Sequence, residues 1–161
     1  MAHLNTLRSI AAGLAFGLAA FSVHAAGNSG LPEIRTINSL QPFDTVVQQL
    51  EKSITENKMG LVAQASASKG AASKGIKIPG NAVLMVFRPD FAVRMLKASV
   101  AAGIEAPLRI YVTENADGTT SVSYRTPSVV FSPYRNSELD KLASELDPIF
   151  ERIVGDAVQG R

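Results

Sequence analysis

The stretch Ala106 to Pro127, APLRIYVTENADGTTSVSYRTP, decides the fold because two alternating strand patterns flank a single turn. Before the turn, Leu108, Ile110 and Val112 alternate with polar residues, and after it Val122 and Tyr124 do the same. Each predicted strand therefore has one apolar and one polar face. The pattern predicts a β-hairpin that is buried on one side only.

The length of the turn sets which residues face each other. A two-residue turn at Asp117-Gly118 would set Val112 opposite Ser123, whereas a three-residue loop over 116–118 sets Val112 opposite Val122. Only the longer loop keeps the apolar faces together, and Gly118 can adopt its left-handed position without a Cβ penalty. The same register places Arg109 directly opposite Arg125.

The polar face of this hairpin is the candidate ligand-binding site. It combines Arg109, Tyr111, Ser123 and Arg125, with Arg88 expected at the end of the neighbouring strand. Two directly opposed arginines are unfavourable unless something neutralises them. One alternative is an internal carboxylate, such as Glu33 or Glu105, on an ion-paired or solvated sheet face; the other is a small bound anion, which guanidinium groups hold bidentately.

The N-terminal residues have the pattern of a secretory signal peptide. Arg8 is the only charge before an apolar run from Ile10 to Val23, and small residues at positions 25 and 26 follow as a cleavage site. We expect residues 1–25 to be removed after Ala25 and the mature protein to be periplasmic or secreted. The run of about 14 residues falls short of the roughly 20 that a membrane span needs, so no stable span is expected after cleavage.

Composition narrows the function classes. The chain has 161 residues, 46% of them hydrophobic, which suits one globular domain. Without Arg8 there are 15 basic and 14 acidic residues, so the basic excess of a nucleic-acid-binding protein is missing. Cys and Trp are absent, and the only histidines, His3 and His24, lie in the predicted signal. The predicted mature chain therefore cannot form Ser-His or Cys-His nucleophile arrangements or zinc sites with histidine ligands, and it lacks the His or Cys ligands usual for haem. We assign no catalytic residue, metal site or cofactor.

The first half of the mature chain predicts alternating strands and helices. Residues 26–32 are expected to be a mobile leader, and a short strand follows over 33–39. An amphipathic helix then runs from Pro42 until Gly60 ends it. A strand follows over 61–67. The continuously apolar run 82–87 predicts a central strand covered on both faces, after which Asp90 is a candidate cap for a helix that ends by Gly103.

Between these strands, Ser-Lys-Gly occurs twice, at 68–70 and 73–75. The repetition suggests a phosphate-binding loop, but such a loop needs Lys and then Ser or Thr directly after its last glycine. Here Gly75 is followed by Ile76 and Lys77. The segment is therefore expected to be a solvated turn or a short helix.

The C-terminal part begins with a proline-punctuated connection over 127–136, in which 129–131 is expected to pack as an edge. Ser137 and Asp140 resemble a capping box for a helix that carries regularly spaced apolar residues. Pro148 interrupts that helix, which predicts either a kink or two short helices in series.

The resulting order is strand, helix, strand, strand, helix, strand, strand, helix. This order predicts a single small α+β domain with a mainly antiparallel sheet and helices packed on one face. The divisions are the signal (1–25), the leader and first strand (26–38), the main α+β domain (39–134) and a C-terminal helical segment (135–161).

Two runs, FDTVVQQLEKSITENKMGLV from Phe43 and VFRPDFAVRMLKASVAAGIEAPLRIYVTENADGTTSVSYRTP from Val86, resemble the DUF302 family over about residues 39–134. The most specific pieces are Ala-Pro-Leu-Arg before the hairpin, the Asp-Gly turn and Ser-Tyr-x-x-Pro after it. The resemblance implies a small α+β domain that is often a homodimer and has no settled activity. Many members carry an Asp-His pair where this chain has Ser66-Ala67, so chemistry that depends on that histidine does not transfer.

Three functions follow as hypotheses. The first is a non-enzymatic module that binds a small anionic or amphipathic ligand, or a protein partner, on the polar hairpin face. The second is a hydrolase that uses Glu114, Asp117 or Asp90 as a base, with Tyr111 or Tyr124 as a donor. The third is copper handling through Met59, Met85 and Met95, whose apolar surroundings favour core packing instead.

Overall fold

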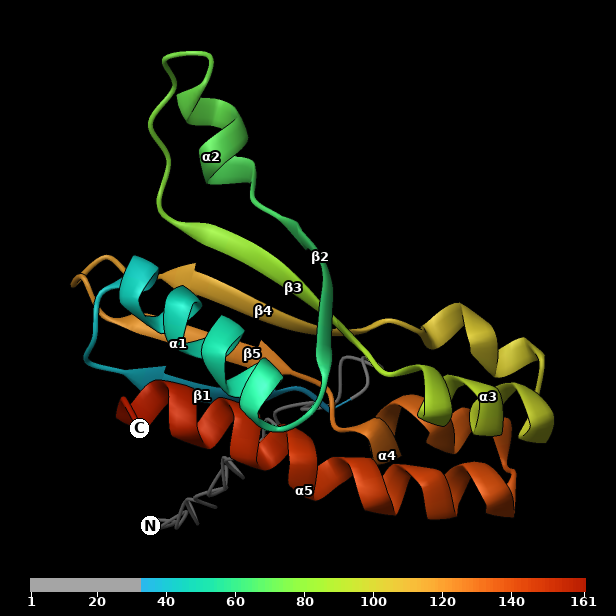
Figure 1. The fold of residues 1–161 in the computed structure, drawn as a ribbon. Coiled ribbons are helices and arrows are strands. Elements are labelled where there is room, and N and C mark those ends of the chain that lie inside the picture. Colours follow the sequence, from blue (N-terminus) through green and yellow to red (C-terminus); the bar gives the residue numbers. More distant parts are fainter. Residues whose placement is uncertain (1–32) are drawn as a thin grey trace, which may run out of the picture. The chain divides into compact units, whose positions relative to one another are not determined.

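A computed structural model describes residues 33–161 and confirms the α+β class (Figure 1). Its five-stranded antiparallel sheet has the order β1-β5-β4-β3-β2. The strands are β1 (Arg35–Ser39), β2 (Gly60–Ala65), β3 (Asn81–Phe87), β4 (Leu108–Glu114) and β5 (Thr120–Tyr124). The β4–β5 hairpin therefore occupies the middle of the sheet, between β1 on one side and β3 on the other.

The long helices lie on one face of the sheet, as predicted (Figure 1). The helices are α1 (Phe43–Glu56), α2 (Ala67–Ala72), α3 (Pro89–Ala98), α4 (Pro127–Phe131) and α5 (Ser137–Gln159), with 3-10 turns η1 (Ala101–Glu105) and η2 (Ser132–Tyr134). α1 packs against α5 and the inner strands, and α5 also reaches β1. Compared with the predicted order, α2 is added between β2 and β3, and α4 between β5 and α5.

The predicted hairpin register is confirmed. Ile110 pairs with Tyr124 and Val112 with Val122. The amide of Asn115 donates to the Thr119 carbonyl at 2.8 Å, which closes a loop over 116–118. Gly118 takes a φ of +81°, the left-handed conformation that the loop requires.

The alternating strands build the core from one side. Ile110, Val112 and Val122 are fully buried, as are Leu84 of β3 and Phe150 of α5. Burying a side chain of this size stabilises the fold by about 1.5–3 kcal/mol. The hairpin's apolar face is therefore the surface on which the helices collect.

Strand β3 differs from its prediction. Its residues alternate between buried and half-buried, so it is covered on one face and not on both. It is an internal strand, but β4 occupies the centre. The run is continuously apolar because Val83, Met85 and Phe87 on its second face are themselves half-buried.

Several helix boundaries also differ from expectation. α1 ends before Lys58, which takes a φ of +57°, so Gly60 is free to begin β2. The N-cap of α3 is Arg88 and not Asp90, because Pro89 fits the first turn without needing an amide partner. The N-cap of α5 is Asn136, whose Oδ1 accepts from the amides of Glu138 and Leu139.

The C-terminal third holds two further corrections. Residues 127–131 form helix α4 and not an edge strand, since Thr126 caps it and Pro127 opens it. α5 is one continuous helix through Pro148, so the alternative of two short helices is wrong. Ser144, whose carbonyl loses its partner to Pro148, is exposed, which lets water replace the missing amide.

The expected signal peptide and its cleavage site lie outside the described residues. Within residues 33–161, no helix has the length and apolarity needed to cross a bilayer.

The hairpin loop gives a first prediction. Gly118 and Gly155 both have open space where a Cβ would be added, but only Gly118 has a positive φ. Gly118→Ala should lower the free energy of unfolding by about 1–2 kcal/mol, because a left-handed residue with a Cβ is strained. Gly155→Ala, inside α5, should raise it by about 0.5–1 kcal/mol. Urea denaturation of both variants measures the difference, and equal effects at the two sites would contradict the assigned loop.

The contact between α3 and α5 gives a second prediction. Arg94 donates two hydrogen bonds to Glu145, at 2.7 and 2.6 Å, and these lower the pKa of the Glu145 carboxyl from its usual 4.5. A depressed folded-state pKa stabilises the fold above the unfolded pKa, and that stabilisation is lost as the pH falls through the folded value. Glu145→Gln should therefore be less stable than the wild type at neutral pH, and the gap should narrow below about pH 4.

Urea midpoints across this pH range test the Glu145 prediction. Glu33→Gln is the matched control, because Glu33 forms no ion pair with any described residue. If Glu145→Gln and Glu33→Gln show the same pH profile, the pair contributes nothing to stability.

Candidate functional site

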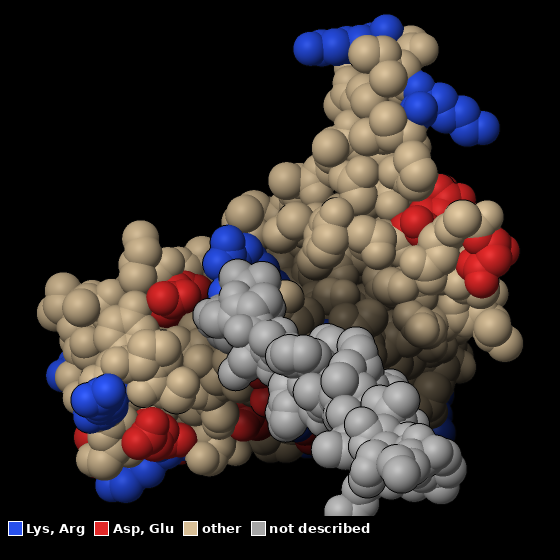
Figure 2. All heavy atoms as spheres, turned by 180° about the vertical axis from the view of Figure 1, so that it is seen from behind, with Lys and Arg blue, Asp and Glu red and all other residues tan. Residues whose placement is uncertain are grey.

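The face of the sheet opposite the long helices carries the polar halves of the central strands. Pairing places Tyr111 beside Ser123 and Thr113 beside Ser121, while Thr36 and Asn38 of β1 lie next to these serines. Figure 2 views the molecule from this side, where it is hollowed over the sheet. Any ligand-binding role of the hairpin therefore belongs to this open face.

A pocket of about 300 Å³ lies in the open face, and we call it the open-face pocket. Its polar lining residues are Glu105, Arg109, Tyr111, Ser123 and Arg125. Its apolar and aromatic lining residues are Ile34, Val83, Leu108, Tyr124 and Val130. Four of the five residues predicted from the sequence are thus brought together in one pocket.

The two arginines reach the pocket from β4 and from the residue that directly follows β5. The last bridged pair of the hairpin is Ile110 with Tyr124, and Arg109 and Arg125 stand one position beyond it. Arg109 is exposed and Arg125 is half-buried. Arg125 has already left β5, which ends at Tyr124, so the predicted direct pairing of Arg109 with Arg125 is not part of the ladder.

Neither pocket arginine has a carboxylate partner among residues 33–161. Arg35, Arg88 and Arg94 each pair with an acidic side chain, whereas Arg109 and Arg125 form no ion pair and donate no side-chain hydrogen bond in this part of the chain. The internal pairing with Glu33 or Glu105 that the sequence suggested is therefore not formed. Like charges on neighbouring strands destabilise a sheet by up to about 1 kcal/mol when nothing lies between them.

Glu105 is the one acidic residue of the pocket. It ends η1, and its Oε1 accepts a hydrogen bond from the Tyr134 hydroxyl at 3.0 Å. Burial raises the pKa of Tyr134, and the bond to Glu105 raises it further. With two guanidinium groups and one carboxylate, the pocket carries a net positive charge.

Within residues 33–161, the hydroxyl groups of Ser123 and Ser121 on the open face hydrogen-bond to Thr and Asn side chains and not to a general base. Ser123 Oγ lies 2.9 Å from Thr36 Oγ1 across the β1–β5 pair, and Tyr111 is 44% exposed. A serine that shares its hydrogen bond with a threonine is not activated as a nucleophile, which needs a neighbouring general base. These groups suit binding through hydrogen bonds.

The apolar residues that line the pocket were not predicted from the sequence. Val83 lines it from β3, Val130 from α4 and Ile34 from just before β1. No turn joins β3 directly to β4, so the sequence held no signal for the register that sets Val83 beside Tyr111. Val130 reaches the pocket because 127–131 is helical. The sequence did not predict this helix, since Pro127 and Pro133 suggested an irregular connection.

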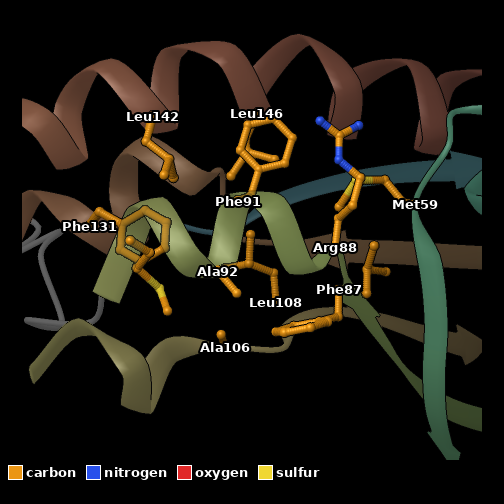
Figure 3. Close-up of a pocket in the computed structure, with 12 residues that line it drawn as sticks. Met59, Phe87, Arg88, Phe91, Ala92, Ala106, Leu108, Phe131, Leu142 and Leu146 are labelled. Atoms are coloured by element: carbon orange, nitrogen blue, oxygen red, sulfur yellow. The ribbon is translucent and has the colours of Figure 1, made fainter. Parts of the chain in front are cut away.

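Arg88 does not join the open-face pocket, and its inclusion is corrected. Its guanidinium stacks 4.0 Å above the Phe91 ring, and its Nε donates to Asp90 Oδ1 at 2.8 Å. Figure 3 shows it beside Phe91 and Met59 at a second cavity of only about 30 Å³. Arg88 follows β3 as the cap of α3, and this position turns its side chain toward the helices.

The residues of the two alternative hypotheses are scattered. Asp90 pairs with Arg88, Asp117 accepts from Thr119 in the turn, and Glu114 accepts from the Gly80 amide at 2.7 Å. Tyr124 faces the core, 6.3 Å from the Phe150 ring. These groups therefore do not converge on one reaction site.

The three methionines of the copper hypothesis are also divided. Met59 and Met95 are buried and line the small cavity between helices and sheet. Met85 belongs to the other face of β3, where it pairs with Arg109 across the strands. A three-methionine site is not formed, and core packing explains Met59 and Met95.

Comparison with known proteins agrees with this fold. The model of the domain of unknown function DUF302 matches residues 35–156, a longer stretch than the 39–134 over which the sequence resembles the family. A crystal structure of an uncharacterized conserved DUF302 protein from Bacillus stearothermophilus is similar, with a TM-score of 0.64 and 20% sequence identity. The similarity covers 78% of this chain and 95% of that one. No curated protein matches the sequence.

Proposed function

The chain belongs to the DUF302 family, whose definition leaves its function open, and from that premise we propose that it is an exported, non-enzymatic binding module. Its ligand is a small anion with an apolar portion, held in the open-face pocket. The observation that carries the proposal is the pair Arg109 and Arg125, which line one pocket without a carboxylate partner among residues 33–161.

The chemistry of the pair selects the ligand's charged group. A guanidinium is planar and presents parallel N–H donors that match the oxygens of a carboxylate, phosphate or sulfate. Two of them lining one pocket would hold one oxyanion from two directions, and the Tyr111 and Ser123 hydroxyls add further donors. A bound anion would also remove the repulsion between the arginines, so binding stabilises the fold.

The rest of the pocket favours a ligand with an apolar portion. Ile34, Val83 and Val130 lie along the same pocket as the arginines, and Ile34 is 50% exposed. Each methylene that a ligand buries there contributes about 0.8 kcal/mol. A volume of about 300 Å³ is at the lower end of small-molecule sites, which favours a compact ligand.

The polar groups that line the pocket support binding without catalysis. Glu105 is the only carboxylate in the pocket lining and is engaged by Tyr134, while Ser123 bonds to Thr36. Hydrolysis through paired carboxylates needs two such groups at a defined separation. No observation favours the hydrolase hypothesis over binding.

Thermal denaturation with inorganic phosphate or sulfate tests the anion site. Both anions should raise the melting temperature of the wild type in a low-salt buffer, through linkage between binding and folding. Arg109→Gln/Arg125→Gln should lose this response while keeping or gaining stability without added anion, because the like-charge repulsion is gone. Hexyl phosphate should stabilise the wild type more than inorganic phosphate does.

Two matched variants control the anion test. Arg135→Gln/Arg161→Gln removes the same charge from exposed arginines that form no ion pair within residues 33–161, and it should keep the wild-type response. Glu105→Gln should bind phosphate several-fold more tightly, since it removes the pocket's negative charge. Equal anion responses in the two double variants would overturn the site, and a large loss of intrinsic stability in the pocket variant would assign the arginines a structural role.

Export is tested separately. Protein recovered from a native-like host should begin at, or within a residue or two of, Ala26, as measured by N-terminal sequencing. A membrane-bound chain that still contains Leu18 would contradict the proposed periplasmic or secreted location.

A further inference from the structure

The connection between β2 and β3 forms an arm, which we define as residues 66–80. It contains α2, which has no buried residue and whose main contacts are with β3. Figure 1 shows α2 and its loop extending beyond the strands that carry them. An exposed segment of this kind adds little to the core, so its composition reflects some other constraint.

The arm is strongly basic in a domain that is otherwise slightly acidic. It carries Lys69, Lys74 and Lys77, and no Asp or Glu occurs between Glu56 and Asp90. Residues 33–161 have 15 basic and 14 acidic side chains, a net charge of +1, so subtracting the arm's +3 leaves −2 for the remainder. Figure 2 shows basic side chains at the end of the arm, with acidic ones closer to the body.

The end of the arm also exposes two aliphatic side chains. Ile76 is 55% exposed and Ile78 is 39% exposed, and they flank Lys77. Gly75 turns the chain just before them, with a φ of +73°. The end of the arm thus combines exposed aliphatic surface with positive charge on one projecting turn.

We propose that the arm docks this protein on the surface of an anionic lipid bilayer. The three lysines would lie among the headgroups, while Ile76 and Ile78 enter the boundary of the acyl chains. The charge distribution supports this orientation, because the +3 arm is attracted to an anionic surface while the −2 remainder is repelled from it. The proposal requires neither a ligand in the open-face pocket nor a membrane-spanning helix.

A lipid surface fits the arm better than other anionic partners do. The arm contains no aromatic residue on which nucleic-acid bases would stack. An acidic protein would satisfy the lysines but would leave the isoleucines uncovered. A bilayer offers negative charge and apolar volume within a few ångströms of each other, which complements the adjacent lysines and isoleucines of the arm.

The base of the arm fixes its direction. The amide of Ala67 donates to Asn81 Oδ1 at 3.0 Å, and Ser68 Oγ accepts from the Asn81 amide at 3.1 Å. At the other end, the Gly80 amide donates to the Glu114 carboxylate at 2.7 Å. Both ends of the arm are therefore tied to β3 and β4, which lets the sheet hold it against a surface.

Co-sedimentation with lipid vesicles tests the proposal, using the chain as recovered from its host with the same N-terminus in every variant. The protein should bind vesicles of phosphatidylcholine mixed with phosphatidylglycerol far more tightly than vesicles of phosphatidylcholine alone, and added salt should weaken that binding. Each lysine near the surface accounts for about a five-fold gain in affinity. Lys69→Gln/Lys74→Gln/Lys77→Gln should therefore lose about a hundred-fold.

Two control variants distinguish the effect of the arm from the effect of removing lysines or exposed apolar side chains elsewhere in the domain. Lys52→Gln/Lys97→Gln/Lys141→Gln removes the same charge elsewhere and should keep most of the affinity. Ile76→Ser/Ile78→Ser should weaken binding several-fold, whereas Val93→Ser/Val100→Ser, at positions that are 52% and 79% exposed, should not.

Four results would overturn the proposal. They are absence of wild-type binding at low salt, equal binding to both kinds of vesicle, equal losses in the two lysine variants, and unchanged binding on replacing Ile76 and Ile78.

Polyglutamate is the comparison probe for an acidic protein partner. Binding to polyglutamate that matches or exceeds binding to anionic vesicles would assign the arm to such a partner instead.

Discussion

The structure depends on the pairing of apolar side chains across the β4–β5 hairpin. Ile110 opposite Tyr124 and Val112 opposite Val122 place every large apolar group of the hairpin on one face. A shift of one residue would bring polar side chains into the core, so the register is strongly specified by burial. The loop at Gly118 is the only part of this arrangement that needs an unusual backbone conformation.

This one-sided burial also produces the candidate site. Helices α1 and α5 cover the apolar face, and the side chains that alternate with the core residues must point the other way. Arg109, Tyr111, Ser123 and Arg125 thus share a face as a consequence of the same register that builds the core. Arg109, Tyr111 and Ser123 are held by the paired strands, and Arg125 directly follows β5, which favours a preformed binding surface.

The sequence was most informative where local periodicity and burial agree. It predicted the α+β class and the hairpin register, and four of the five residues that it proposed for a site lie in one pocket. It failed where tertiary position decides direction. Arg88 lies one residue after β3, and the start of α3 turns it toward Phe91. The pairing of β3 with β4 crosses a whole helix, so no local signal placed Val83 in the pocket. Helix α4 was missed because its prolines suggest an irregular connection, although Pro127 is well suited to a first helical turn.

The charges of the domain divide in a way that stability alone does not explain. Arg35 and Arg94 are ion-paired, as folding energetics would favour, whereas the pocket arginines have no carboxylate partner in the described chain and the arm lysines occupy a segment without acids. Exposed lysines are easily solvated, but lysines beside exposed isoleucines match a surface that offers both charge and apolar volume. The two arginines that line one pocket match a compact oxyanion instead, since guanidinium donors are rigid and planar. The two positive regions are built from different residue types on different supports, and this chemistry assigns them different anionic partners.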